Sequence, residues 1–260
     1  VHVDYIMFIS SSHDQADIKS VKDEISNLYK IKDFEKAVYF LGIKIDDDQK
    51  GNIKLSQTRY IENILERFNM TESKKVTTPM LPPSDILNKR VSSKEERIAM
   101  IGVPYREAIG ALMYLSVRTR PDISVSVCIL AKHVQDPRKV HWEAVKRIMR
   151  YLKGTKEGLI LHKTLHIKDI KLSLFADADW GTDPDDRHSR TGVVCQLGRS
   201  TIWWKSRKQT SVAVSSCEAE YMALFEASKD AIWLRNLLCE FDFCKGAEPT
   251  KIYHDCNGMR

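Results

Sequence analysis

The sequence contains no long hydrophobic run and no recognisable cysteine motif. Its apolar stretches stay well short of the ~20 residues that span a membrane, and its first residues lack the pattern of a signal peptide. None of the six cysteines forms a C-x-x-C pair or stands beside histidines at the spacing of zinc ligands. We therefore expect reduced thiols in an intracellular protein, cytoplasmic or nuclear, with no membrane partner.

An initiator methionine is also missing. The chain opens inside a strand-like pattern, "VHVDYIMFIS", so we expect a fragment of a longer protein. Its 260 residues are enough for a real core and favour two domains over one. The net charge of +6 is compatible with a nucleic-acid partner but does not establish one.

Hydrophobic periodicity predicts a mixed α/β (α+β) fold. The predicted helices cover residues 12–31, 59–70, 104–117, 122–135, 140–153 and 216–239. The predicted strands cover residues 37–45, 52–57, 158–162, 170–178, 191–198, 200–205 and 251–255, with further strand pattern in residues 1–10. Residues 74–96 are rich in proline, serine and charge, which predicts a linker or a surface loop.

The stretch "KLSLFADADWGTDPDD" places carboxylates at the end of a buried strand. An unpaired buried charge is costly, so such residues need a cation, a hydrogen-bond network or water. Asp177 and Asp179 fall on the same face, and strand periodicity does not choose between them. The later aspartates of this stretch are expected to form a solvated turn: Asp183, Asp185 and Asp186.

Two further carboxylates can reach the same strand end. Glu220 shares the apolar stripe of helix 216–239, whereas Glu218 stands at capping-box spacing after Ser215. Asp255 closes the last predicted strand. Three carboxylates at one point repel unless cations bind, and Mg²⁺ or Mn²⁺ prefers such oxygen ligands. From spacing alone, an acidic turn with two unrelated acids explains the pattern equally well.

Basic residues gather just before and within this region. Cations interleaved with aromatic residues suit a phosphate backbone with stacked bases. The candidates lie on one face of helix 140–153 or beside two adjacent tryptophans: Lys146, Arg150, Lys153, Lys205, Arg207 and Lys208. A solvated helix face is the alternative, and we favour nucleic acid because the acidic cluster adjoins these residues.

Several long motifs resemble the Pol polyproteins of copia-type LTR retrotransposons. The ribonuclease H region of that family is similar to "FADADWGTDPDDRHSRTG", "IWWKSRKQTSVAVSSCEAEYMAL" and "IYHDCN". The segment before it, the end of the reverse transcriptase and its connection, resembles "PYREAIGALMYLSVRTRPDI" and "HWEAVKRIMRYLKGT". The palm-to-thumb part of the polymerase resembles "FLGIKI", "LSQTRYIENILERFNM" and "TTP". The motifs follow the family's order and cover nearly the whole chain.

The resemblance implies an architecture. It implies a partial reverse transcriptase palm and thumb with a helical connection, followed by a truncated ribonuclease H-like mixed sheet with a packed helix. The corresponding divisions are residues 1–73 for the polymerase remnant, 74–103 for a linker or loop, 104–163 for the connection and 164–260 for the ribonuclease H-like domain.

The resemblance also implies roles. It assigns Asp177, Glu220 and Asp255 as catalytic metal ligands, which resolves the choice against Asp179 and Glu218. The reaction implied is hydrolysis of the RNA strand of an RNA–DNA hybrid with two Mg²⁺ or Mn²⁺ ions. An intact element would carry this activity in virus-like particles.

The chain departs from the family at both sites. The polymerase motif of an aromatic residue, a variable residue and two aspartates reads "HVDY", so Asp4 is followed by Tyr5, and we expect no reverse transcriptase activity. Cys256 replaces the family's asparagine, and the family's fourth nuclease acid would lie beyond Arg260. The alternative hypothesis is therefore a non-catalytic nucleic-acid-binding remnant of a decayed element.

Overall fold

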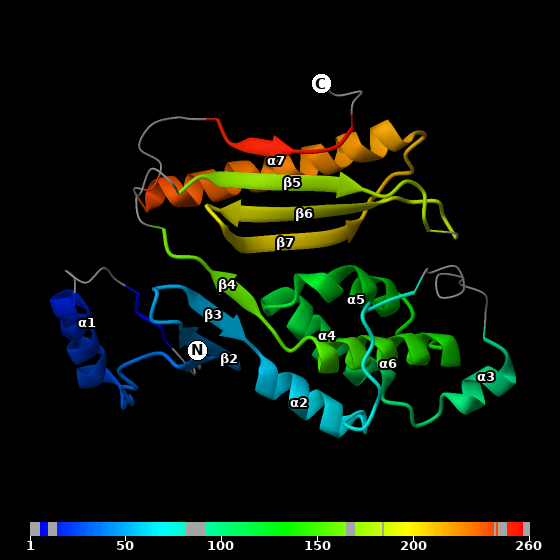
Figure 1. The fold of residues 1–260 in the computed structure, drawn as a ribbon, viewed down its shortest axis with the longest axis horizontal. Coiled ribbons are helices and arrows are strands. Elements are labelled where there is room, and N and C mark those ends of the chain that lie inside the picture. The colour runs from blue at the N-terminus through cyan, green and yellow to red at the C-terminus, as the bar shows by residue number, and fades with distance from the viewer. Residues whose placement is uncertain are drawn as a thin grey trace.

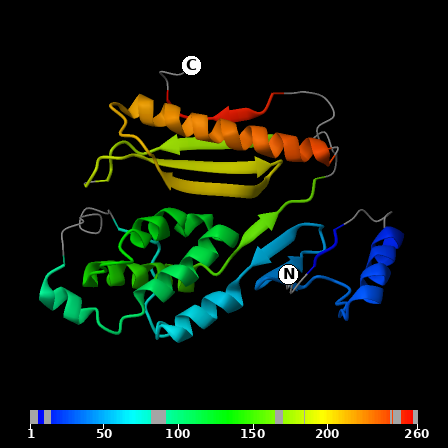
Figure 2. The same cartoon turned by 180° about the vertical axis from the view of Figure 1, so that it is seen from behind.

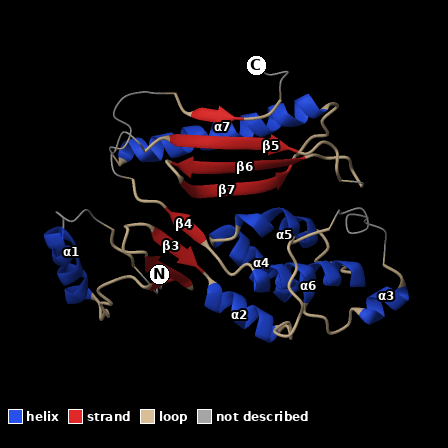
Figure 3. Cartoon of the chain, viewed as in Figure 1, coloured by secondary structure: helices blue, strands red, loops and turns tan. Residues whose placement is uncertain are grey.

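A computed structural model describes residues 6–9, 15–81, 92–164, 170–183, 185–241, 243 and 249–256. Within these residues the chain forms two four-stranded sheets and a group of helices (Figures 1 and 3). The predicted mixed α/β (α+β) class is confirmed. Among the described helices, none combines the length and apolarity needed to cross a bilayer.

The first sheet has the strand order β1-β2-β3-β4, with antiparallel neighbours throughout. It follows helix α1 (Gln15–Leu28) and consists of β1 (Tyr39–Phe40), β2 (Ile43–Asp47), β3 (Ile53–Ser56) and β4 (Leu159–Leu161). The prediction of one strand over 37–45 is wrong. Leu41 and Gly42 adopt positive φ angles of 48° and 73°, which fold β1 back onto β2. The hydroxyl of Tyr114 donates a hydrogen bond to the Leu41 carbonyl and supports this turn.

Helices next to this sheet share one hydrophobic core. They are α2 (Thr58–Arg67), α4 (Tyr105–Arg118), the 3₁₀ turn η1 (Pro121–Ile123), α5 (Ser124–Ala131) and α6 (Lys139–Gly154). The short helix α3 (Lys94–Ala99) contributes no residue to this core. Ile61 of α2, Leu112 of α4 and Ile148 of α6 are almost completely buried together. The predicted helices at 59–70, 104–117, 122–135 and 140–153 are therefore found, although α5 is shorter than expected.

Helix α3 was not predicted, because the stretch 74–103 was expected to be a linker or loop. Ser93 caps the helix by accepting a hydrogen bond from the Glu96 amide at 3.2 Å. The Glu96 side chain accepts in return from the Ser93 amide at 3.0 Å. The sequence signal was a capping box, "SKEE", placed inside a charged segment.

The second sheet has the order β7-β6-β5-β8, and only β8 runs parallel to its neighbour. Its elements are β5 (Leu172–Ala178), β6 (Arg190–Leu197), β7 (Ser200–Lys208), the helix α7 (Ser216–Glu240) and β8 (Lys251–Tyr253). Helix α7 covers one face of this sheet (Figure 2). Small residues on its inner stripe, including Ala223, Ala227 and Ala231, let the helix approach Leu174 and Val193 closely.

The helices and the second sheet have separate cores, and β7 lies on the side of the second sheet that faces β4 and α5 (Figure 1). The Trp204 indole of β7 donates a hydrogen bond of 2.8 Å to the carbonyl of Ser116 in α4. The amide of His162, just after β4, donates to the Ser200 hydroxyl at 2.8 Å. Helix α2, from the predicted polymerase remnant, and helices α4 to α6, from the predicted connection, contribute to one core, while the division of the chain into four functional parts stays a prediction.

Asp183 contradicts the expectation of a solvated turn. The residue is only 4% exposed, and its carboxylate pairs with Lys132 of α5 and, at 2.8 Å, with Lys208 of β7. Burial opposes ionisation, yet the hydrogen bonds from Lys132 and Lys208 lower the pKa of Asp183 to about 2. This buried ion pair links α5 to the second sheet, which local sequence pattern does not reveal.

We predict that Asp183→Asn destabilises the chain by about 2 kcal/mol at pH 7, because it removes a carboxylate whose pKa is depressed on folding. Because the pKa of Asp183 is lower in the folded state, its ionised carboxylate stabilises the fold at pH values above the unfolded-state pKa of about 3.9. This stabilisation is lost as the pH falls toward 2. Urea unfolding of both proteins at several pH values measures this. The difference should shrink below pH 4, whereas the exposed neighbour variant Asp185→Asn should change little. An equal loss at all pH values would contradict the ion-pair explanation.

Candidate metal centre

Three carboxylates converge at one edge of the second sheet. Asp177 lies near the end of β5, Glu220 lies in the first turns of α7, and Asp255 follows β8. One oxygen from each can be chosen so that all lie within 4.8 Å of one another. The parallel register pairs Phe175 with Tyr253, and continuing it by two residues brings Asp177 level with Asp255.

Glu220 is the buried member of this group, at 9% exposure. Its Oε1 accepts a hydrogen bond of 3.2 Å from the Ala178 amide, whereas its buried Oε2 has no hydrogen-bond partner among the described residues. Burial raises the pKa of Glu220, and the charges of Asp177 and Asp255 raise it further against the opposing Ala178 hydrogen bond. A buried carboxylate oxygen without a partner, facing two other carboxylates, fits a bound cation.

The neighbouring acids have structural roles instead. Asp179 accepts hydrogen bonds of 2.6 Å from the Arg190 amide and from the Thr182 hydroxyl, so it holds the turn after β5. Glu218 accepts from the Val214 amide at 2.7 Å, and its own amide donates to the N-cap hydroxyl of Ser215 at 3.1 Å. The geometry therefore separates the two candidate pairs that sequence periodicity left open.

Comparisons with known proteins agree with the motifs. The family described as "Reverse transcriptase (RNA-dependent DNA polymerase)" matches residues 1–82. The Pol polyprotein from transposon TNT 1-94 of Nicotiana tabacum is 38% identical over 242 residues, covering 92% of this chain and 18% of that protein. The Pol polyprotein from transposon RE1 of Arabidopsis thaliana is 37% identical over 98% of this chain and 17% of its own length. An uncharacterized mitochondrial protein of Arabidopsis thaliana is 35% identical over 90% of this chain and 92% of that protein.

The chain belongs to the Pol family of copia-type retrotransposons. It spans 18% or less of the first Pol polyproteins that it matches. No solved structure gives a significant match. Asp4 and Tyr5, the altered polymerase motif of this Pol chain, lie outside the described residues.

The helical cations expected to bind nucleic acid make contacts inside the Pol chain. Lys146 forms an ion pair of 2.6 Å with Glu143. Arg150 donates to the carbonyl of Lys74 at 2.8 Å, and Lys153 donates to carbonyls in residues 71–73. These contacts fasten the segment after α2 to α6, so a role in nucleic-acid binding stays a prediction.

The cations of β7 are also largely engaged. Lys205 pairs with Glu226 at 3.1 Å and with Asp230 at 2.6 Å, both on α7. Lys208 belongs to the buried ion pair with Asp183. Arg207 differs, because its side chain is exposed and makes no ion pair or hydrogen bond with the described residues. Of the six residues predicted to bind nucleic acid, Arg207 is therefore the one that these described contacts leave available to bind a phosphate.

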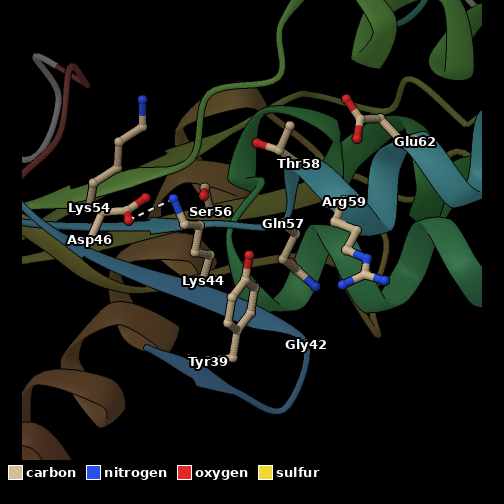
Figure 4. Close-up of a pocket in the computed structure, with 10 residues that line it drawn as sticks. All are labelled: Tyr39, Gly42, Lys44, Asp46, Lys54, Ser56, Gln57, Thr58, Arg59 and Glu62. Carbon is tan, nitrogen blue, oxygen red and sulfur yellow. Dashed lines mark ion pairs between the residues drawn. The ribbon is translucent and has the colours of Figure 1, made fainter. Parts of the chain in front are cut away.

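A pocket on the first sheet was missed by the sequence analysis. It has a volume of about 350 Å³ and is lined by charged side chains of both signs from β2, β3 and α2 (Figure 4). Lys44 and Asp46 form an ion pair of 2.7 Å within it, with Lys54 and Arg59 nearby. Alternating charge along β2 is the signal that could have found it. The pocket lies on the other sheet from the carboxylates and is not part of their site.

We predict that Asp255→Asn lowers the pKa of Glu220, because it removes a neighbouring negative charge that raises this pKa. Carboxyl ¹³C NMR titration of the chelator-treated protein measures the change. The variant Glu240→Gln, at the opposite end of α7, serves as the control and should leave the pKa unaltered. An unchanged Glu220 pKa in Asp255→Asn would show that the carboxylates do not interact.

Proposed function

We propose that Asp177, Glu220 and Asp255 form the divalent-metal site of a ribonuclease H-type endonuclease, which hydrolyses the RNA strand of RNA–DNA hybrids. The observation that supports this is the meeting of the three carboxylates, one of them with a buried oxygen that has no hydrogen-bond partner in the part of the chain that the structure describes. Membership of the Pol family supports a nucleic-acid substrate.

The surroundings of each residue indicate its role in the proposed site. The Ala178 amide fixes Glu220 and leaves its second oxygen free to bind a cation, while Asp177 and Asp255 are exposed and face the solvent from which substrate arrives. A pair of Mg²⁺ or Mn²⁺ ions would supply an activated water and would stabilise the leaving oxygen of the phosphodiester. Exposed Arg207 is the described candidate for holding the nucleic-acid backbone near this edge.

Polymerase activity is not part of this proposal. The family match at residues 1–82 places the chain in a polymerase lineage, but Tyr5 stands where the second aspartate of the motif is expected. A single carboxylate at this position provides fewer ligands for divalent ions than the pair.

We predict that Asp177→Asn and Glu220→Gln each reduce cleavage of a labelled RNA–DNA hybrid by more than about 100-fold, since a metal ligand in such a site contributes several kcal/mol to the transition state. Glu218→Gln, two residues from Glu220 and engaged in the helix cap, is the matched control and should cleave like the parent. Fluorescence anisotropy should show similar hybrid affinity for all three variants.

Cleavage by Asp177→Asn at the parent rate would overturn the assignment. A well-folded parent that binds the hybrid and does not cleave it would instead support the alternative, a non-catalytic nucleic-acid-binding remnant.

We also predict opposite effects of Glu220→Gln on stability with and without metal. In chelator the variant should melt above the parent, because it removes a buried charge and its repulsion by two neighbours. With millimolar Mn²⁺ the parent should gain at least about 3 °C and the variant almost nothing, because binding to the folded state stabilises it. Calorimetry under both conditions measures this. Equal gains in both proteins would place the ions elsewhere.

A further inference from the structure

Two cysteines lie beside the carboxylates. Cys217 is in the first turn of α7, three residues before Glu220, and Cys256 directly follows Asp255. Their sulfur atoms lie 3.5 Å apart, although the residues are 39 positions apart in the sequence. Each residue is partly exposed, so a small reagent can reach the pair.

The other described cysteines lack this arrangement. Cys195 is fully buried in the second core, and Cys128 points toward the carbonyl of Ser206 at 3.6 Å. Cys239 is exposed at the opposite end of α7. Within the described part of the chain, Cys217 and Cys256 are the pair whose sulfur atoms are in contact.

We propose that Cys217 and Cys256 form a reversible disulfide that ties the end of β8 to the first turn of α7. A disulfide needs its sulfur atoms about 2.05 Å apart, so they must approach by roughly 1.5 Å. Strand β8 can supply this movement, because it is three residues long and pairs with β5 alone among the described strands. Cys256 itself lies beyond the strand, outside the β5–β8 pairs that the described residues form.

The exchange needs an oxidant, and a low-molecular-weight disulfide such as oxidised glutathione suffices. One cysteine thiolate attacks a sulfur of that disulfide, which forms a mixed disulfide and releases one reduced thiol. The second cysteine then attacks the protein-bound sulfur of the mixed disulfide, forming the Cys217–Cys256 bond and releasing the second thiol. Two electrons and two protons pass from the cysteines to the oxidant, so the step balances.

The bond would act on the least supported carboxylate of the centre. Asp255 follows the short strand β8, and its carboxylate makes no hydrogen bond with the described residues. A covalent link at the next residue holds Asp255 near Glu220 and removes freedom from the 39-residue span that it closes. The disulfide itself does not depend on the proposed nuclease activity, since it rests on the two thiols alone.

The test compares the full chain with Cys256→Ser and Cys239→Ser after equilibration with oxidised glutathione. The parent and Cys239→Ser should each yield a peptide pair linked through Cys217 and Cys256 in a non-reducing mass map. Both should melt at least about 5 °C higher when oxidised, and dithiothreitol should reverse the shift. Deuterium uptake around residues 249–256 should fall on oxidation in both. Cys256→Ser should show none of these changes.

Persistent glutathione adducts on Cys217 or Cys256 without a link between them would overturn the proposal. So would a link through Cys239, or a linked protein that melts lower than the reduced one. The peptide map of the unaltered chain decides the matter even where Cys256→Ser folds poorly. None of these readouts involves nucleic acid. The disulfide proposal therefore succeeds or fails whether or not the nuclease assignment holds.

Discussion

The parallel pairing of β8 with β5 determines where the third carboxylate lies. Parallel neighbours require a crossover, and α7, at 25 residues, rises about 37 Å and carries the chain back along the sheet before β8 begins. The ends of β5 and β8 and the start of α7 therefore meet at one edge. A slip of one residue in this short register would turn Asp255 to the opposite face and separate it from Asp177.

Two groups of acids from one stretch of sequence have opposite energetic effects. Asp183 is buried between Lys132 and Lys208, and this pairing stabilises its charge. Asp177 lies six residues earlier and faces two other carboxylates, with no lysine ion pair among the described contacts. The partial positive charge at the start of α7 offsets some of that repulsion. Burial and the remaining repulsion together raise the pKa of Glu220.

Periodicity and capping patterns predicted the elements that depend on interactions between residues close in the sequence. The inner stripe of α7, its Ser215 cap and the strands β5 to β7 follow from periodicity and capping chemistry. The Leu41–Gly42 turn and the burial of Asp183 did not, because each depends on a partner far along the chain, Tyr114 in one case and Lys132 in the other. The choice of Asp177 over Asp179 was likewise unavailable to periodicity, since it depends on the Arg190 amide of the next strand.

The same distinction between local patterns and distant contacts applies to the basic side chains. A run of lysine and arginine on a helix predicts a basic face, but the sequence does not show that α6 uses Arg150 and Lys153 to hold residues 71–74. For the acidic centre, the constraint lies in the short strand that carries one of its carboxylates. Asp255, the third ligand of the proposed site, follows a strand of three residues, so holding it in place costs ordering free energy that a bound cation would have to offset. If Asp177 and Asp255 held the proposed cation, they would join β5 to β8 beyond the last described backbone pair, Phe175 with Tyr253. For the proposed site, metal affinity and the local stability of β8 would therefore be linked, and any contact that holds β8 in place would also strengthen metal binding.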